Sequence, residues 1–94
     1  MNKQVVTISP DVLAQEVSGE TVLLDLQSEN YFGLDEVGTR IWQLLQKNGE
    51  VHSVFDALLQ EYDVDAEQLQ SDLENLLTEL ETAGLIQVDS IKES

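Results

Sequence analysis

The spacing of apolar residues changes once along the chain, close to Leu34. Before that residue apolar and polar side chains alternate, which is typical of β-strands, and after it apolar side chains recur every three or four positions, which is typical of helices. Strands first and helices afterwards predict an α+β domain, because a parallel α/β sheet needs strands and helices to alternate. The 94 residues are enough for one domain and leave no room for a second.

Three segments in the first third predict the strands of an antiparallel meander. These strands are residues 12–17, 21–27 and 31–34. The turns between them are predicted at Ser18-Gly19-Glu20 and Ser28-Glu29-Asn30, which are rich in turn-forming residues. A short extended piece is expected upstream at residues 5–8, and another after the helices at residues 85–88. We expect the last few residues of the chain to be frayed.

Three helices are predicted after the meander, each with an apolar stripe that must pack on the others. Asp35 is the expected N-cap of the first helix, which ends at Asn48-Gly49. Asp65, with Gln68 three residues later, predicts a capping box for the third and longest helix, which ends at Gly84. Its predicted buried stripe is Leu69, Leu73, Leu76, Leu77 and Leu80. The predicted fold is therefore a three-stranded antiparallel N-terminal sheet followed by a three-helix bundle, with the outline of a winged helix-turn-helix.

The charge balance limits the partners of such a domain. The chain has 19 Asp and Glu residues against 4 Lys and Arg, a formal net charge of −15. Such a chain repels nucleic-acid phosphates and anionic lipid, so we expect neither nucleic acid nor a membrane as a partner. No Lys or Arg occurs between Asn48 and Ile91. This acidic half is either a solvated surface that keeps the protein soluble or an attractor for a basic partner.

Residues for catalysis or metal binding are not evident in the sequence. The chain has no Cys, and its single histidine, His52, has no recognisable nucleophile or co-ligands, so we expect it on the helix surface. Asp63 and Asp65 lack the spacing of a calcium loop, and helix capping is their expected role. We therefore expect no catalytic residue, no metal and no cofactor. With no signal-peptide pattern and no apolar run near ~18 residues, a cytoplasmic protein is expected.

The last predicted strand is the strongest candidate for a binding element. Tyr31, Phe32, Gly33 and Leu34 form a short apolar segment between a turn and a helix start. If this segment is an edge strand, its unpaired backbone groups can pair with an extended peptide. Alternatively, Phe32 and Leu34 face the core and the helices cover the edge. The alternation of residues is compatible with both.

The residues of these elements resemble a known family. The run from Val22 to Leu26, the run from Tyr31 to Gly38 and the run from Ile41 to Leu45 resemble the PqqD-like peptide chaperones. Those proteins are the precursor-peptide recognition elements of ribosomally made, modified peptides. The second half fits the same pattern at residues 58–65, 69–73, 76–77, 80 and 84–86. The resemblance covers roughly residues 12–88 and is closest to the stand-alone leader-binding proteins of lasso-peptide pathways.

The resemblance implies a single PqqD-like peptide-recognition domain over residues 1–94 that binds a precursor's leader peptide as an extra strand, without catalysis. It also implies that the domain presents the precursor to a leader peptidase or another modifying enzyme. The implied peptide-binding residues are Tyr31, Phe32, Gly33, Leu34, Leu69, Asp72, Leu73 and Leu76. Core packing is the competing role for the leucines, favoured for Leu73 and open for Leu69 and Leu76. Two alternative functions remain. The protein could be a PqqD-like chaperone for a radical-SAM modifying enzyme, or an acidic winged-helix transcription regulator.

Overall fold

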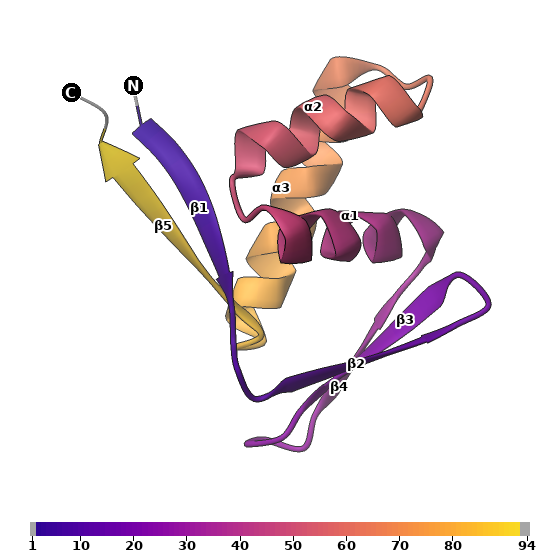
Figure 1. Cartoon of the computed structure of the whole chain (residues 1–94), viewed down its shortest axis with the longest axis vertical. Coiled ribbons are helices and arrows are strands. Elements are labelled where there is room, and N and C mark those ends of the chain that lie inside the picture. The colour runs from indigo at the N-terminus through magenta and orange to yellow at the C-terminus, as the bar shows by residue number, and fades with distance from the viewer. Residues whose placement is uncertain (1, 93–94) are drawn as a thin grey trace.

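Two antiparallel sheets and three helices make up the computed structural model, which describes residues 2–92 (Figure 1). The elements are β1 (Asn2–Ile8), β2 (Val12–Val17), β3 (Glu20–Asp25), β4 (Tyr31–Leu34), α1 (Glu36–Lys47), α2 (Val51–Glu61), α3 (Ala66–Thr82) and β5 (Ile86–Lys92). The predicted α+β class, the three helices and the great length of α3 are confirmed. Between residues 2 and 92 there is no helix with the length and apolar character needed to cross a membrane.

The predicted meander is present as a three-stranded sheet in the order β2-β3-β4. Its first turn is tight because Ser18 and Gly19 both have positive φ, the conformation that suits a two-residue hairpin. β3 ends at Asp25, earlier than the predicted residue 27. The Asp25 carboxylate accepts hydrogen bonds from the Gln27 N–H (3.1 Å) and the Ser28 hydroxyl (2.9 Å), and these bonds turn the chain toward β4.

The predicted layout of a single N-terminal sheet is wrong in one respect. The extended pieces expected at residues 5–8 and 85–88 are seven-residue strands, β1 and β5, that pair antiparallel along their whole length. They form a second, two-stranded sheet, and β5 continues past the predicted residue 88 to Lys92. The last few residues, expected to fray, include residues 93–94, which lie outside the described range. Both strands are rich in polar residues, and Val6 and Ile86 are the members that reach the buried core. Local patterns therefore gave little indication of a pairing between chain segments so far apart in sequence.

The first helix begins as the sequence predicts, whereas the second begins without a side-chain cap. The Asp35 carboxylate caps α1 by accepting a hydrogen bond from the Gly38 N–H at 2.8 Å, so the predicted N-cap is confirmed. Glu50 precedes α2 and makes no side-chain capping bond. The start of α2 is instead positioned through Lys3 of β1, whose Nζ lies 3.2 Å from the Glu50 carboxylate.

The capping box predicted for α3 is wrong. Asp65 makes no side-chain capping bond, and the Gln68 side chain donates to the Asp72 carboxylate (2.9 Å) one turn further along the helix. The C-terminal end of α3 agrees with the prediction: Gly84 has a φ of +79°, and the Leu85 N–H donates to the carbonyl of Leu80. A glycine in this conformation turns the chain directly into β5.

Gly49 has a role that its position after a helix does not reveal. The carbonyl of Gly49 accepts a hydrogen bond from the Val6 N–H at 2.7 Å, which ties the α1–α2 connection to β1. A β-carbon at residue 49 would clash with the backbone carbonyl oxygen of Val6. The connection therefore lies against β1 at a distance that only glycine permits.

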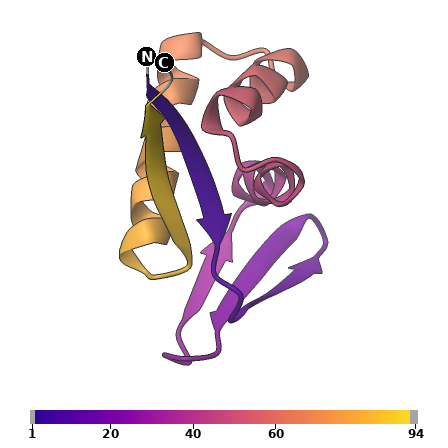
Figure 2. The same cartoon turned by 60° about the vertical axis from the view of Figure 1, so that its left-hand side comes forward.

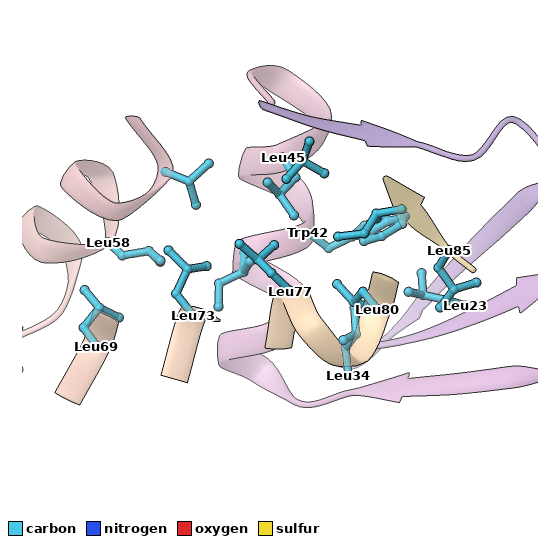
Figure 3. Close-up of a cluster of buried hydrophobic side chains, with 14 residues drawn as sticks. Leu23, Leu34, Trp42, Leu45, Leu58, Leu69, Leu73, Leu77, Leu80 and Leu85 are labelled. Carbon is cyan, nitrogen blue, oxygen red and sulfur yellow. The ribbon is translucent and has the colours of Figure 1, made fainter. Parts of the chain in front are cut away.

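The hydrophobic core lies between the helices and reaches both sheets (Figures 2 and 3). The largest fully buried side chains are Leu23 of β3, Leu58 of α2, Leu80 of α3 and Leu85, which lies between α3 and β5. Figure 3 shows Leu73, Leu77 and Leu80 of α3 in this cluster, as the helical stripe predicts. Leu76 belongs to the predicted stripe but is only half-buried, since it lies at the edge of the core.

An ion pair joins α1 to the end of α2 and makes a pH-dependent contribution to stability. Arg40 donates from Nε and Nη2 to the two carboxylate oxygens of Glu61, both at 2.7 Å. These hydrogen bonds, with the attraction of the Arg40 charge, hold the pKa of Glu61 below its ordinary value. Such a carboxyl stabilises the fold above its unfolded pKa of about 4.3, and the contribution is lost as the pH falls through the lower, folded pKa.

We expect Glu61→Gln to lower the melting temperature at neutral pH and to have no effect in strong acid, where Glu61 is protonated in the parent as well. The measurement is a thermal melt of parent and variant from pH 7 down to about pH 3. His52→Gln is the control, because His52 pairs with Asp56 on the exposed surface of α2. A difference between parent and Glu61→Gln that stays constant over this pH range would contradict the assignment.

Candidate functional site

β4 is an edge strand, since it pairs with β3 on one side and with no other strand among residues 2–92. The register opposes Leu23 to Phe32 and Val22 to Gly33. Leu34 is buried and Phe32 is half-buried toward the helices, whereas Tyr31 is 73% exposed on the opposite face. Both alternatives left open by the sequence hold in part: Phe32 and Leu34 do face inward, yet no strand covers the edge.

The hydrogen bonding of the ladder identifies which backbone groups of β4 are free. The Asp25 N–H donates to the carbonyl of Asn30 at 3.0 Å, so this cross-strand pair is a hydrogen-bonded one. In an antiparallel ladder hydrogen-bonded pairs alternate with pairs whose backbone groups point away from each other. Phe32 and Leu34 therefore bond to β3, while the N–H and C=O groups of Tyr31 and Gly33 point to the free edge.

A groove of about 450 Å³ runs beside this edge, between β4, the start of α1 and α3. Its apolar residues are Phe32, Leu34, Val37, Ile41 and Leu76. Three acidic residues, Asp35, Asp72 and Glu79, also line it, and it contains no Lys or Arg. The groove thus offers apolar contacts in its floor and negative charge at its margin, next to unpaired backbone groups.

The structure brings together five of the eight residues implied by the resemblance: Phe32, Gly33, Leu34, Asp72 and Leu76 all line the groove. Tyr31 is on the same strand but on the outer face of the sheet. Leu69 and Leu73 are 5% and 2% exposed and belong to the core instead.

Sequence analysis missed Val37, Ile41 and Glu79 as groove residues. Glu79 lies seven residues after Asp72 and three after Leu76, so helical spacing alone places these three on one face of α3. Val37 and Ile41 have the helical spacing of an apolar stripe on α1, which predicts core packing for both. Ile41 is indeed buried, but Val37 is 40% exposed at the mouth of the groove.

A larger hollow of about 570 Å³ lies on another side of the molecule, between β1, α2 and α3. Four of its charged residues form pairs: Lys3 with Glu50, and His52 with Asp56 at 3.4 Å. Glu74 also lines it and accepts a hydrogen bond from the Gln70 side chain. The exposed position of His52 confirms its predicted place on the helix surface. Within the described range 2–92, no group of three or more His, Asp or Glu residues is arranged to hold a metal ion. β1, which borders this hollow, is also an edge strand, but it is already bridged to the α1–α2 connection through Val5 and Glu50. The groove beside β4 is the stronger candidate, because its apolar residues lie next to an edge strand that has no such bridge among residues 2–92.

An edge strand with outward-facing amides beside an apolar groove defines a small α+β domain suited to accepting an extended chain. The family model of coenzyme PQQ synthesis protein D (PqqD) matches residues 20–86. The chain belongs to the PqqD family, as the resemblance predicted.

Two solved structures are similar to most of this chain. The first is TbiB1 in complex with the TbiA(β) leader peptide, with 40% identity, a TM-score of 0.82 and coverage of 86% of this chain and 94% of that one. The second is a lasso peptide synthetase B1 complexed with the leader peptide, with 26% identity, a TM-score of 0.78 and coverage of 87% and 96%. No curated protein sequence matches the chain.

Proposed function

We propose that this protein binds the leader region of a ribosomally synthesised precursor peptide and presents the precursor to its processing enzyme, as in lasso-peptide maturation. The observation that carries the proposal is the free edge of β4 beside the groove. Two similar structures, at 40% and 26% identity, contain a leader peptide, which supports the same role here. The enzyme served is a leader peptidase or another modifying enzyme.

Strand addition to β4 provides affinity and the groove provides selectivity. The free N–H and C=O groups of Tyr31 and Gly33 form main-chain hydrogen bonds with the leader. Alternate leader side chains then point into the groove, against Phe32 and Leu76, where apolar side chains are favoured. Asp72 and Glu79 at the margin attract Lys or Arg side chains of the leader.

The protein supplies no bond-making chemistry in this proposal. Holding the leader fixes the rest of the precursor close to the enzyme, which raises its effective concentration there. We assign this role to one domain in a winged-helix-like arrangement, in which β4 and α3 provide the groove. Leu69 and Leu73 act indirectly, because their burial holds α3 in place.

The experiment that tests the proposal is a titration of the protein into a fluorescently labelled leader peptide from its own pathway, followed by a cleavage assay. We expect saturable binding and faster processing of the precursor by the pathway's leader peptidase. A scrambled leader of the same composition is the control for charge attraction. Equal binding of both peptides would rule the proposal out, and so would rates of all the pathway's processing enzymes that stay unchanged when the protein is added. Stimulation of a radical-SAM enzyme instead of the peptidase would change only the enzyme served.

Substitutions at two leucines of α3 distinguish a residue of the binding groove from a residue of the core. We expect Leu76→Ala to weaken leader binding by about fivefold or more, since truncating a central interface side chain costs about 1 kcal/mol or more. Leu73→Ala should instead lower the free energy of unfolding by about 2–5 kcal/mol, because Leu73 is fully buried. The measurements are the leader-binding constant and the thermal melt of each variant, compared with those of the parent. If Leu76→Ala binds the leader as the parent does, the groove is not the binding site.

A further inference from the structure

The three-stranded sheet has one face that points away from the helices (Figure 2). The exposed side chains on this outer face are mostly apolar. We define this outer face by Leu13, Val17, Val22, Leu24 and Tyr31. Four of these side chains are 44–73% exposed, and Leu24 is half-buried between its neighbours. The register aligns Leu13, Leu24 and Tyr31 as cross-strand neighbours, so an unbroken apolar row crosses β2, β3 and β4.

Charge argues against a second copy of this chain as the occupant of the outer face. Each copy carries a formal charge of −15, and two such bodies repel. Residues 9–34, which contain all three strands and their turns, include no Lys or Arg. Glu20 lies on the outer face opposite Val17, and Asp11 and Glu29 lie in the connections at its margin. Glu16 and Asp25 point to the other face of the sheet, where Glu16 contacts Gln43 of α1 and Asp25 is buried. An apolar surface set in this acidic segment fits a protein partner whose own apolar patch is flanked by Lys or Arg.

The outer face is continuous with the proposed leader site. A peptide strand added to β4 points every second side chain into the groove and the others outward, beside Tyr31. The apolar row on the outer face then crosses four strands instead of three. The fourth strand is the leader itself, so it is present only when the leader is bound. A partner that docks on the outer face thus contacts the protein and its bound peptide together.

We infer that the outer face is the docking surface for the enzyme that processes the bound precursor, and that this enzyme brings a basic-rimmed apolar patch to it. The inference rests on the proposed leader binding and adds the place where the enzyme meets the complex. The enzyme distinguishes loaded from empty protein because the leader supplies part of the docking surface.

The test uses the double variant Leu13→Thr/Val17→Thr. Both residues lie on β2, the strand farthest from β4, and threonine keeps a high β-propensity while removing apolar surface. Val64→Thr is the matched control, because Val64 is also apolar and 46% exposed but lies between α2 and α3. Each variant is titrated with labelled leader peptide and then assayed for stimulation of the pathway's leader peptidase.

We expect the double variant to bind the leader within about twofold of the parent, a change of less than about 0.5 kcal/mol. The concentration needed for half-maximal stimulation of the peptidase should rise at least about tenfold, or 1.4 kcal/mol. Val64→Thr should match the parent in both assays. If the double variant stimulates the peptidase as fully as the parent does, the outer face is not the docking surface. The inference also fails if sedimentation shows that the parent forms a dimer and the double variant does not. If the parent itself fails to bind the leader, the proposed function fails first.

Discussion

Replacing Gly33 with proline is expected to lower affinity for the leader peptide by at least about tenfold, because an unmade backbone hydrogen bond costs about 1–3 kcal/mol. The Gly33 N–H points to the free edge of β4 and makes no bond to β3, so proline removes the donor that the leader needs and no bond within the sheet. Proline is tolerated on edge strands at such positions. The measurement is the binding constant for the leader, with a thermal melt to confirm that the variant folds.

Gly33→Ala is the matched control for this substitution. A β-carbon at residue 33 meets no atom within 4 Å, and alanine keeps the N–H. We therefore expect Gly33→Ala to bind the leader nearly as the parent does. If Gly33→Pro folds and still binds with parental affinity, the leader does not add to β4.

Gly49→Ala is expected to give the largest loss of stability among the glycine variants. The new methyl group would clash with the Val6 carbonyl oxygen, and the connection between α1 and α2 would have to move away from β1. Overpacking of this kind costs about 1–3 kcal/mol or more, against a total stability of about 5–15 kcal/mol for a domain. With a shift of about 4–8 °C per kcal/mol, the melting temperature should fall by about 10 °C or more.

The control for Gly49→Ala is again Gly33→Ala, which introduces the same methyl group into open space. The two variants undergo the same change in unfolded-state entropy, so the difference between their melts isolates the contact with β1. Equal melting temperatures would show that the connection can move away from β1 without cost.

The local elements were predictable because their signals are contained within short windows. Asp35 before an apolar stripe gave the start of α1, and Gly84 gave the end of α3. The pairing of β1 with β5 was not predictable in this way, since it depends on contacts between the two ends of the chain. Asp65 and Gln68 had the spacing of a capping box, but the nearby Asp72 carboxylate competes for the Gln68 side chain.

The part of the candidate site on β4 could be predicted from the sequence better than the part on α3. Alternation put Phe32 and Leu34 on one face of a single strand but left open whether that face meets the core. The structure shows that it does, and that Tyr31 and Gly33 have the free backbone groups. On α3 the leucines share one broad stripe, and sequence alone does not show where core ends and groove begins. That boundary is set by the neighbouring elements: Leu73 is covered and Leu76 is left at the margin.

The antiparallel pairing of β1 with β5 makes Asn2 and Lys92 cross-strand neighbours, so the polypeptide enters and leaves the fold at one place. In Figure 1 this place lies at the opposite end of the molecule from β4. A domain with adjacent ends can be inserted into a loop of another protein, or joined end to end, without stretching its host. The same fold can therefore be carried inside a longer enzyme with its peptide edge still open to solvent.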